Sequence, residues 1–220
     1  QTVITYAQNL DMTQKATILI QILQALTYLH RRGILHRDIK PANVMMDNGQ
    51  VKVLDFGLSA HTEQARGVVG TLEYMAPEVL RGGKISPASD IYAVGIIAYR
   101  LFVGKYPFDA RNPTRMMSQI MTTIPDVSPL NHPALETVLV RWLHKDGQER
   151  YQTAEMVIAD LCHALNLPIP TESEAIRESF LQSAQFIGRE AELSQLIEAL
   201  EGAQANHGGM WLVGGESGVG

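Results

Sequence analysis

Apolar residues recur every three to four positions after Asp11, a pattern that predicts a long amphipathic helix. Asp11 followed three residues later by Gln14 is a typical helix start, because each side chain can cap a backbone N–H at that end. Gly33 follows the last apolar position and is expected to stop the helix. The apolar face consists of Ala16, Leu19, Ile20, Leu23 and Leu26.

A second helix is predicted after Ser86 and Pro87, which suit the N-cap and the first turn. Its residues 88–104 are apolar on nearly every face, so we expect this helix to be buried inside the domain. Asp90 lies within it and would need a polar partner. Weaker helix signals begin at Asn112–Pro113, at His132–Pro133 and at Thr153, the last running through Leu165.

Asn48–Gly49 predicts a two-residue hairpin turn between apolar-rich runs at 43–46 and 51–54. In that register Asn43 lies opposite Leu54 and diagonal to Asp55. An amide oxygen and a carboxylate are thereby brought together, and such oxygen ligands suit Mg²⁺ beside phosphates.

The composition changes near residue 168, after "NLPIP". Residues 168–184 are bounded by proline and rich in Ser and Glu, which is typical of a linker, and a new domain is expected over 185–220. That stretch predicts a helix, then a strand, then the front half of the phosphate-binding pattern G-x-x-x-x-G-K-[ST]. The partial P-loop comprises Gly215, Gly218 and Gly220 and should hold phosphate weakly at best without its lysine.

The 220-residue chain is 45% hydrophobic and 19% charged, with a formal net charge of -5 and a single cysteine. This composition excludes a disulfide framework and indicates a reducing, cytoplasmic setting. The longest apolar stretch, 91–99, is too short to span a membrane, and we find no export signal. The charge is nearly balanced through residue 170 and acidic beyond it, so nucleic-acid binding is not expected.

The stretch "HRDIKPANVMMDNGQVKVLDFG", followed by "APE", carries the candidate chemistry. Taken singly, its acids would be turn formers, its lysine solvated surface, and Asn43 an Asx-turn. Together, the spacing HRD-x-K-x-x-N with DFG and APE resembles the eukaryotic-type (Hanks-type) Ser/Thr protein kinases over residues 1–167.

The resemblance implies ATP, Mg²⁺ and protein Ser/Thr substrates, and it assigns roles to individual residues. Asp38 would be the catalytic base, Lys40 the cation that steadies the transferred phosphoryl group, and Asn43 with Asp55 the metal ligands. Met45 would form the floor under adenine, so the nucleotide-binding residues are Met45, Lys40, Asn43 and Asp55.

The same resemblance implies several structural roles. His36 and Phe56 would pack around the site, Asp90 would hold the backbone of the catalytic loop, and Glu78 would pair with Arg150.

In the activation segment, Thr71 would help to position the substrate. Arg37 precedes the catalytic Asp, as in kinases switched by loop phosphorylation, although only Ser59 and Thr62 could accept phosphate upstream of Thr71. Glu63 could supply a weaker fixed charge to Arg37, or could simply be a solvated loop residue.

The expected fold is mainly α with small β-hairpins, that of the C-terminal lobe of a protein kinase. The N-lobe would be absent, because its glycine-rich loop, lysine, glutamate and hinge would all precede residue 1. The stretch "FIGREAELSQLIEALE" resembles the entry to AAA-type NTPase modules in large bacterial signalling proteins.

Two alternatives stay open. The lobe could be a pseudokinase scaffold that regulates an attached AAA-type ATPase, or the NTPase could be the main activity.

Overall fold

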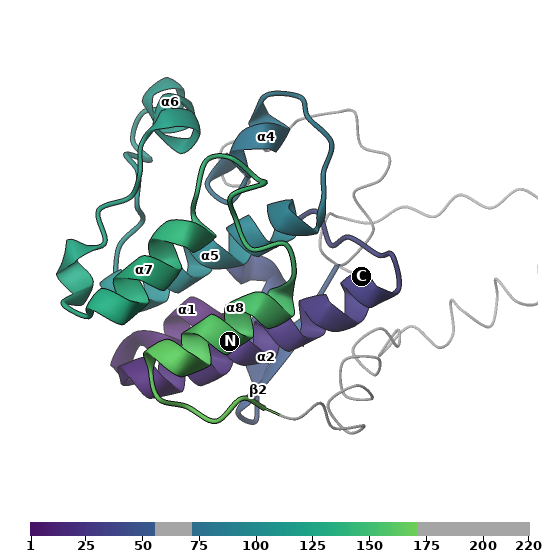
Figure 1. Ribbon diagram of the computed structural model, residues 1–220, viewed down its shortest axis with the longest axis vertical. Helices are drawn as coiled ribbons and strands as arrows, with labels where there is room; N and C mark the ends of the chain where they lie inside the picture. Colours follow the sequence, from purple (N-terminus) through teal and green to yellow (C-terminus); the bar gives the residue numbers. More distant parts are fainter. Residues whose placement is uncertain (56–71, 171–220) are drawn as a thin grey trace, which may run out of the picture.

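The computed structural model describes residues 1–55 and 72–170 (Figure 1). The expectations for Phe56, Ser59, Thr62, Glu63 and Thr71 lie outside the described residues. So do those for Gly215, Gly218, Gly220 and nearly all of the linker. Within the described part, helices dominate and one two-stranded hairpin is present. The helices are α1 (Val3–Tyr6), α2 (Met12–Arg31), α4 (Pro77–Leu80), α5 (Pro87–Val103), α6 (Pro113–Thr122), α7 (Pro133–Trp142) and α8 (Ala154–Ala164), with short 3-10 turns η1 (Ala7–Asn9), η2 (Pro41–Asn43) and η4 (Ser128–Leu130), and the strands are β1 (Val44–Asp47) and β2 (Gln50–Val53).

Helix α2 begins as its sequence predicts. The Asp11 carboxylate accepts a bond from the Gln14 backbone N–H at 2.8 Å, and the Gln14 amide oxygen accepts one from the Asp11 N–H at 3.0 Å. The helix ends at Arg31, and Gly33 adopts a φ of 72° in the turn that follows. This capping box and glycine stop confirm the predicted limits.

Helix α5 is the buried centre of the domain. It packs against α2 and α7, and its side chains are buried over most of its length. The Trp142 indole N–H donates to the Ile91 carbonyl at 2.7 Å, and Gly95 leaves room for that ring. The all-round apolar pattern of residues 88–104 is thus explained by neighbours on several sides.

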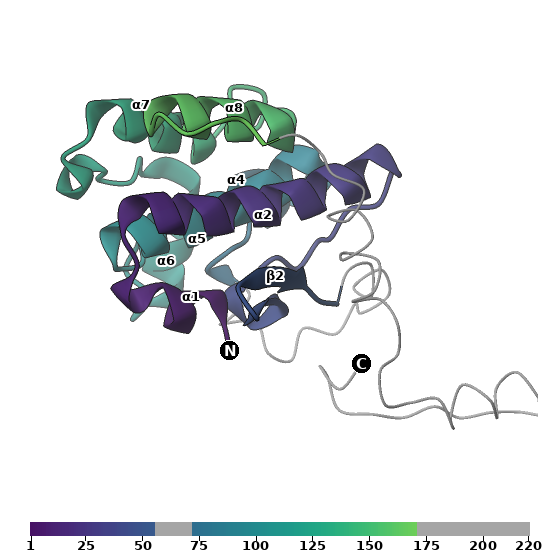
Figure 2. The same cartoon turned by 90° about the horizontal axis from the view of Figure 1, so that it is seen from below.

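The layers are clearest in Figure 2. Helices α7 and α8 form one layer, α2 and α5 lie beneath them, and the hairpin with α1 covers the opposite side of α2. Among residues 1–55 and 72–170, no helix is both long enough and apolar enough to span a membrane.

The hairpin has the predicted register. Val44 pairs with Val53 and Asp47 with Gln50, with Asn48 and Gly49 both at positive φ in the turn. Asn43 itself belongs to the turn η2 and not to β1, because Pro41 cannot donate a ladder hydrogen bond and favours a helical turn. Its carbonyl nevertheless accepts a bond from the Leu54 N–H at 2.9 Å, so the predicted pairing across the hairpin is confirmed.

Candidate functional site

The loop between α2 and η2 is fastened to α5 through Asp90. This carboxylate is 3% exposed and accepts bonds from the backbone N–H groups of His36 and Arg37, each at 2.9 Å. The His30 imidazole contacts the same carboxylate at 2.9 Å. Arg37 has a φ of 70°, an unfavourable value for a non-glycine residue, and the bonds to Asp90 hold it there. The buried acid of α5 therefore has the backbone partners that were expected.

His36 joins this loop to the end of the hairpin. Its side chain is fully buried, with Nε2 2.9 Å from the Leu54 carbonyl oxygen. Nδ1 accepts a bond from the Asp38 N–H at 3.3 Å, which assigns the proton to Nε2. Burial lowers the pKa of His36, against the opposing charge of Asp90, and so favours this neutral form. The imidazole thus fixes Leu54, and with it the start of Asp55, relative to Asp38.

Asp38, Lys40 and Asn43 form one connected group. The Lys40 Nζ lies 2.6 Å from the Asp38 Oδ2. The Asn43 side-chain amide donates to the Asp38 carbonyl at 2.9 Å and to its Oδ2 at 3.0 Å. The side chains of Asp38 and Lys40 are 20% and 27% exposed, so a carboxylate and an ammonium reach the surface side by side.

The donor set near the hairpin fits a magnesium ion. Because the Asn43 NH₂ group donates to Asp38, its amide oxygen is the atom that could bind a cation, and Asp55 follows Leu54 directly. Within the described ranges there is no cluster of three or more His, Cys, Asp or Glu that could hold a metal. A site built from one amide and one carboxylate suits Mg²⁺, which takes its remaining ligands from phosphates and water.

Met45 lies on the opposite face of the hairpin from the core. Val44 and Met46 on either side of it are buried, whereas Met45 is half-buried and pairs with Lys52. The structure therefore leaves this side chain on an outer face, where an apolar ring could contact it.

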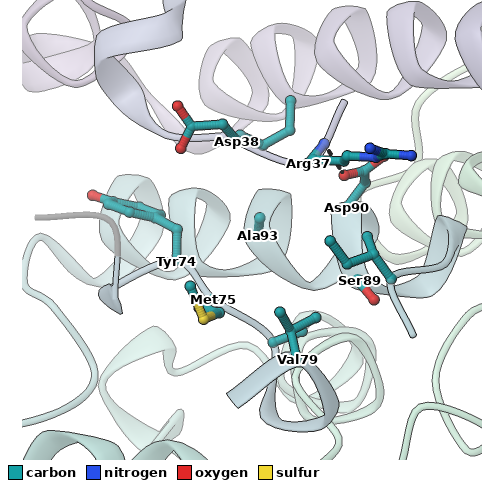
Figure 3. A pocket seen from close by; sticks show the side chains of 11 residues that line it. Arg37, Asp38, Tyr74, Met75, Val79, Ser89, Asp90 and Ala93 are labelled. Carbon is teal, nitrogen blue, oxygen red and sulfur yellow. Dashed lines mark hydrogen bonds between the residues drawn. The ribbon is translucent and has the colours of Figure 1, made fainter. Parts of the chain in front are cut away.

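A cavity of about 110 Å³ lies beside the group around Asp38. Figure 3 shows it between the loop that carries Arg37 and Asp38, helix α5, and the segment leading into α4. The labelled side chains that line it are Arg37, Asp38, Tyr74, Met75, Val79, Ser89, Asp90 and Ala93.

The segment below this cavity is fixed by an ion pair between Glu78 and Arg150. Arg150 is 1% exposed and donates two bonds to the Glu78 carboxylate, one of them at 3.0 Å, and one to the Ala88 carbonyl at 3.0 Å. The Ser89 hydroxyl donates to Glu78 at 2.8 Å. The pairing expected of Glu78 and Arg150 is therefore present, and it joins α4 to the start of α5.

Sequence reasoning missed three residues at this site. His30 supports Asp90, while Tyr74 lines the cavity and accepts a bond from the Arg100 guanidinium. Arg100 and Tyr74 are 26 positions apart, and His30 and Asp90 are 60 apart. No local periodicity or motif spacing links residues at such separations.

The chain is similar in sequence to known proteins over most of its length. Residues 1–163 match the sequence model of the protein kinase domain. A probable serine/threonine-protein kinase of Corynebacterium efficiens is 39% identical over 166 residues, covering 68% of this chain and 25% of the relative. The serine/threonine-protein kinase PknB of Mycobacterium tuberculosis is 34% identical over 191 residues, covering 79% of this chain and 30% of the relative. The matched part thus spans less than a third of these relatives. By the extent of the domain match, the chain belongs to the protein kinase domain family.

Proposed function

We propose that this chain provides the catalytic loop of a Ser/Thr protein kinase, which transfers the γ-phosphate of ATP to Ser/Thr hydroxyls of proteins. The observation that carries the proposal is the surface carboxylate of Asp38, held by Lys40 at 2.6 Å and by Asn43 at 3.0 Å. The serine/threonine-protein kinases that resemble this chain support the same assignment.

Asp38 would orient the acceptor hydroxyl and take its proton. The hydroxyl oxygen forms a bond to the γ-phosphorus while the bond from that phosphorus to the bridging oxygen breaks, and ADP leaves with the electron pair. Lys40, already beside the Asp38 carboxylate, would place its positive charge against the oxygens of the transferred group. Such a reaction depends on positioning and charge stabilisation, for which a loop fixed to a buried helix is well suited.

Asn43 and Asp55 would hold Mg²⁺, and Met45 would contact the adenine. The bound metal would neutralise charge on the phosphates as the bond breaks. Asn43 is 6% exposed and tied to Asp38, so its amide oxygen would be oriented before the nucleotide binds.

The roles of the activation segment are also proposals. Arg37 is exposed, and a phosphate on Ser59 or Thr62, or the carboxylate of Glu63, could meet its guanidinium. Thr71 would help to position the acceptor, and Phe56 would pack beside the metal ligand that precedes it.

For the domain organisation, we propose a kinase C-terminal lobe over residues 1–167 and a linker over 168–184. Residues 185–220 would begin an AAA-type P-loop ATPase domain within a cytoplasmic multidomain signalling protein. This organisation is supported by the change in composition near residue 168 and by the glycine pattern at 215–220.

The test compares Asp38→Asn with Asp47→Asn in the full-length protein. Asp47 is a matched control, because its carboxylate also binds a lysine, Lys52 at 2.8 Å, but it is exposed and lies beside the hairpin turn. With radiolabelled ATP and casein as the acceptor, Asp38→Asn should lower kcat at least about 100-fold, as expected for loss of a general base. Asp47→Asn should stay within about twofold, as for a surface ion pair.

Equal activity of wild type and Asp38→Asn would refute the role of Asp38. A wild type that does not phosphorylate casein at all would refute the kinase activity itself, and would favour a binding module.

A further inference from the structure

Two hydrogen bonds join residues 73–74 to the C-terminal end of α5 and to the segment that follows it. The Tyr106 hydroxyl donates to the Glu73 carbonyl at 2.5 Å, and the Arg100 guanidinium donates to the Tyr74 hydroxyl. We call these two contacts the Tyr106 clamp. Neither belongs to the network around Asp90 or to the Glu78–Arg150 ion pair.

The local fold explains how Tyr106 reaches Glu73. Helix α5 ends at Val103, and Gly104 takes a φ of 81°, a left-handed conformation that reverses the chain at the helix end. The Tyr106 ring then packs edge-on against buried Phe108, with 5.8 Å between the ring centroids. This packing restricts the ring and directs its hydroxyl to the Glu73 carbonyl.

The Tyr106 hydroxyl is a permanent donor. Burial raises its pKa far above its ordinary value, and the neighbouring hydroxyl of Tyr92 and the carboxylate of Glu73 act in the same direction. The phenol therefore keeps its proton throughout the physiological range. The contact with Glu73 does not change with pH there.

The clamp holds one wall of the cavity beside Asp38. Tyr74 and Met75 line that cavity, and in Figure 3 the ends of Tyr74 and Asp38 point to the same side of it. Asp90 of α5 holds the loop before Asp38, while Arg100, ten positions further along α5, holds Tyr74. Helix α5 thus sets the distance between the loop that carries Asp38 and the segment that carries Tyr74.

We propose that Tyr106 and Arg100 are positioning residues for the protein substrate, because they hold residues 73–75 at a fixed distance from Asp38. This inference rests on the proposed kinase function. Without the clamp the Glu73 carbonyl would lose the Tyr106 donor and the wall could shift, which weakens substrate binding. The nucleotide site, built on the hairpin and the loop at 36–43, would be unchanged.

The experiment compares Tyr106→Phe with Tyr99→Phe in the full-length protein. Tyr99 is a matched control, because its hydroxyl also donates to a backbone carbonyl, that of Asp126 at 2.7 Å, away from the cavity. The measured quantities are kcat, KM for ATP and KM for casein, with thermal unfolding to verify that each variant is folded. For Tyr106→Phe, KM for casein should rise about fivefold, the effect of about one hydrogen bond. Its kcat and KM for ATP should stay within about twofold.

A second variant, Arg100→Gln, removes the other contact of the clamp and should give the same change in KM for casein. It also provides the test if Tyr106→Phe does not fold. The proposal is overturned if Tyr106→Phe and Tyr99→Phe behave alike, or if kcat falls while KM for casein stays constant. It is equally overturned if Arg100→Gln leaves KM for casein unchanged. An inactive wild type would instead refute the proposed function, on which the clamp depends.

Discussion

Replacing Asp90 by Asn tests whether α5 sets the conformation of the loop that carries Asp38. The side chain keeps its shape but loses its charge and one of its two acceptor oxygens. In the wild type, Oδ2 accepts bonds from the His36 N–H and from His30, and Oδ1 accepts one from the Arg37 N–H. The best arrangement for Asn keeps its oxygen at the Oδ2 position. Its NH₂ group then faces the Arg37 N–H, donor against donor.

The expected loss of stability follows from these contacts. One backbone N–H without its acceptor costs about 1–3 kcal/mol, and the two remaining bonds weaken because they are no longer charge-assisted. The Arg37 N–H is only partly buried, so water offsets some of the cost. We therefore expect Asp90→Asn to lower the free energy of unfolding by about 2–4 kcal/mol.

Activity should fall further than the folded fraction does. Arg37 is held at a φ of 70° by the bond that Asn cannot make, so its backbone is free to relax in the variant. Asp38 is the next residue and would move with it. At temperatures where both proteins are folded, kcat should therefore fall at least about tenfold, a barrier increase of about 1.4 kcal/mol.

Urea unfolding followed by circular dichroism measures stability, and phosphorylation of casein measures kcat. Asp126→Asn is the control, because the Asp126 carboxylate also accepts a backbone N–H bond, that of Ser128 at 3.1 Å, but in an exposed turn. It should change stability by less than about 0.5 kcal/mol. The reasoning fails if Asp90→Asn lies within the same limit, or if it is destabilised but keeps full kcat when folded.

Two further predictions concern the packing around α5. Gly95→Ala places a Cβ 2.8 Å from the Trp142 ring and 2.9 Å from a Leu143 methyl. The free energy of unfolding measured in urea should therefore fall by about 1–3 kcal/mol. An unchanged unfolding midpoint would contradict this packing. Burial alone would raise the pKa of Glu78, but the hydrogen bond and charge of Arg150 hold this pKa below its ordinary value of 4.5. The ion pair therefore stabilises the fold above pH 4.5, and this stabilisation is lost as the pH falls below that value. The stability difference between wild type and Glu78→Gln should therefore shrink from pH 7 to pH 3, and a constant difference would mean that the ion pair contributes nothing.

Local signals in the sequence were enough to predict the secondary-structure elements that carry the site. Asn48–Gly49 set the hairpin turn and the register that places Asn43 opposite Leu54, because a two-residue turn leaves little freedom in strand pairing. The start of α2 at Asp11 was predicted equally well, because a capping box is made by residues three apart. The partners of Asp90 and Glu78 came instead from the family resemblance, which carries long-range contacts that periodicity does not encode.

The contacts that the sequence did not predict all join distant parts of the chain. Tyr106 lies 33 positions from Glu73, and the bond between them depends on the left-handed turn at Gly104. A glycine after a helix signals its end but not which carbonyl the next tyrosine will meet. The cavity is hidden for the same reason, since the loop, α4 and α5 meet there only after the core has packed.

The attachment of a surface loop to a buried helix has a consequence for heat inactivation. The amides of His36 and Arg37 belong to a loop, yet their acceptor Asp90 is on the helix at the centre of the core. Freeing the loop means exposing that carboxylate without its partners, which costs nearly as much as disrupting the core around it. Loss of the proposed phosphoryl transfer on warming would then coincide with melting of the described domain, without an earlier stage in which only the site is lost.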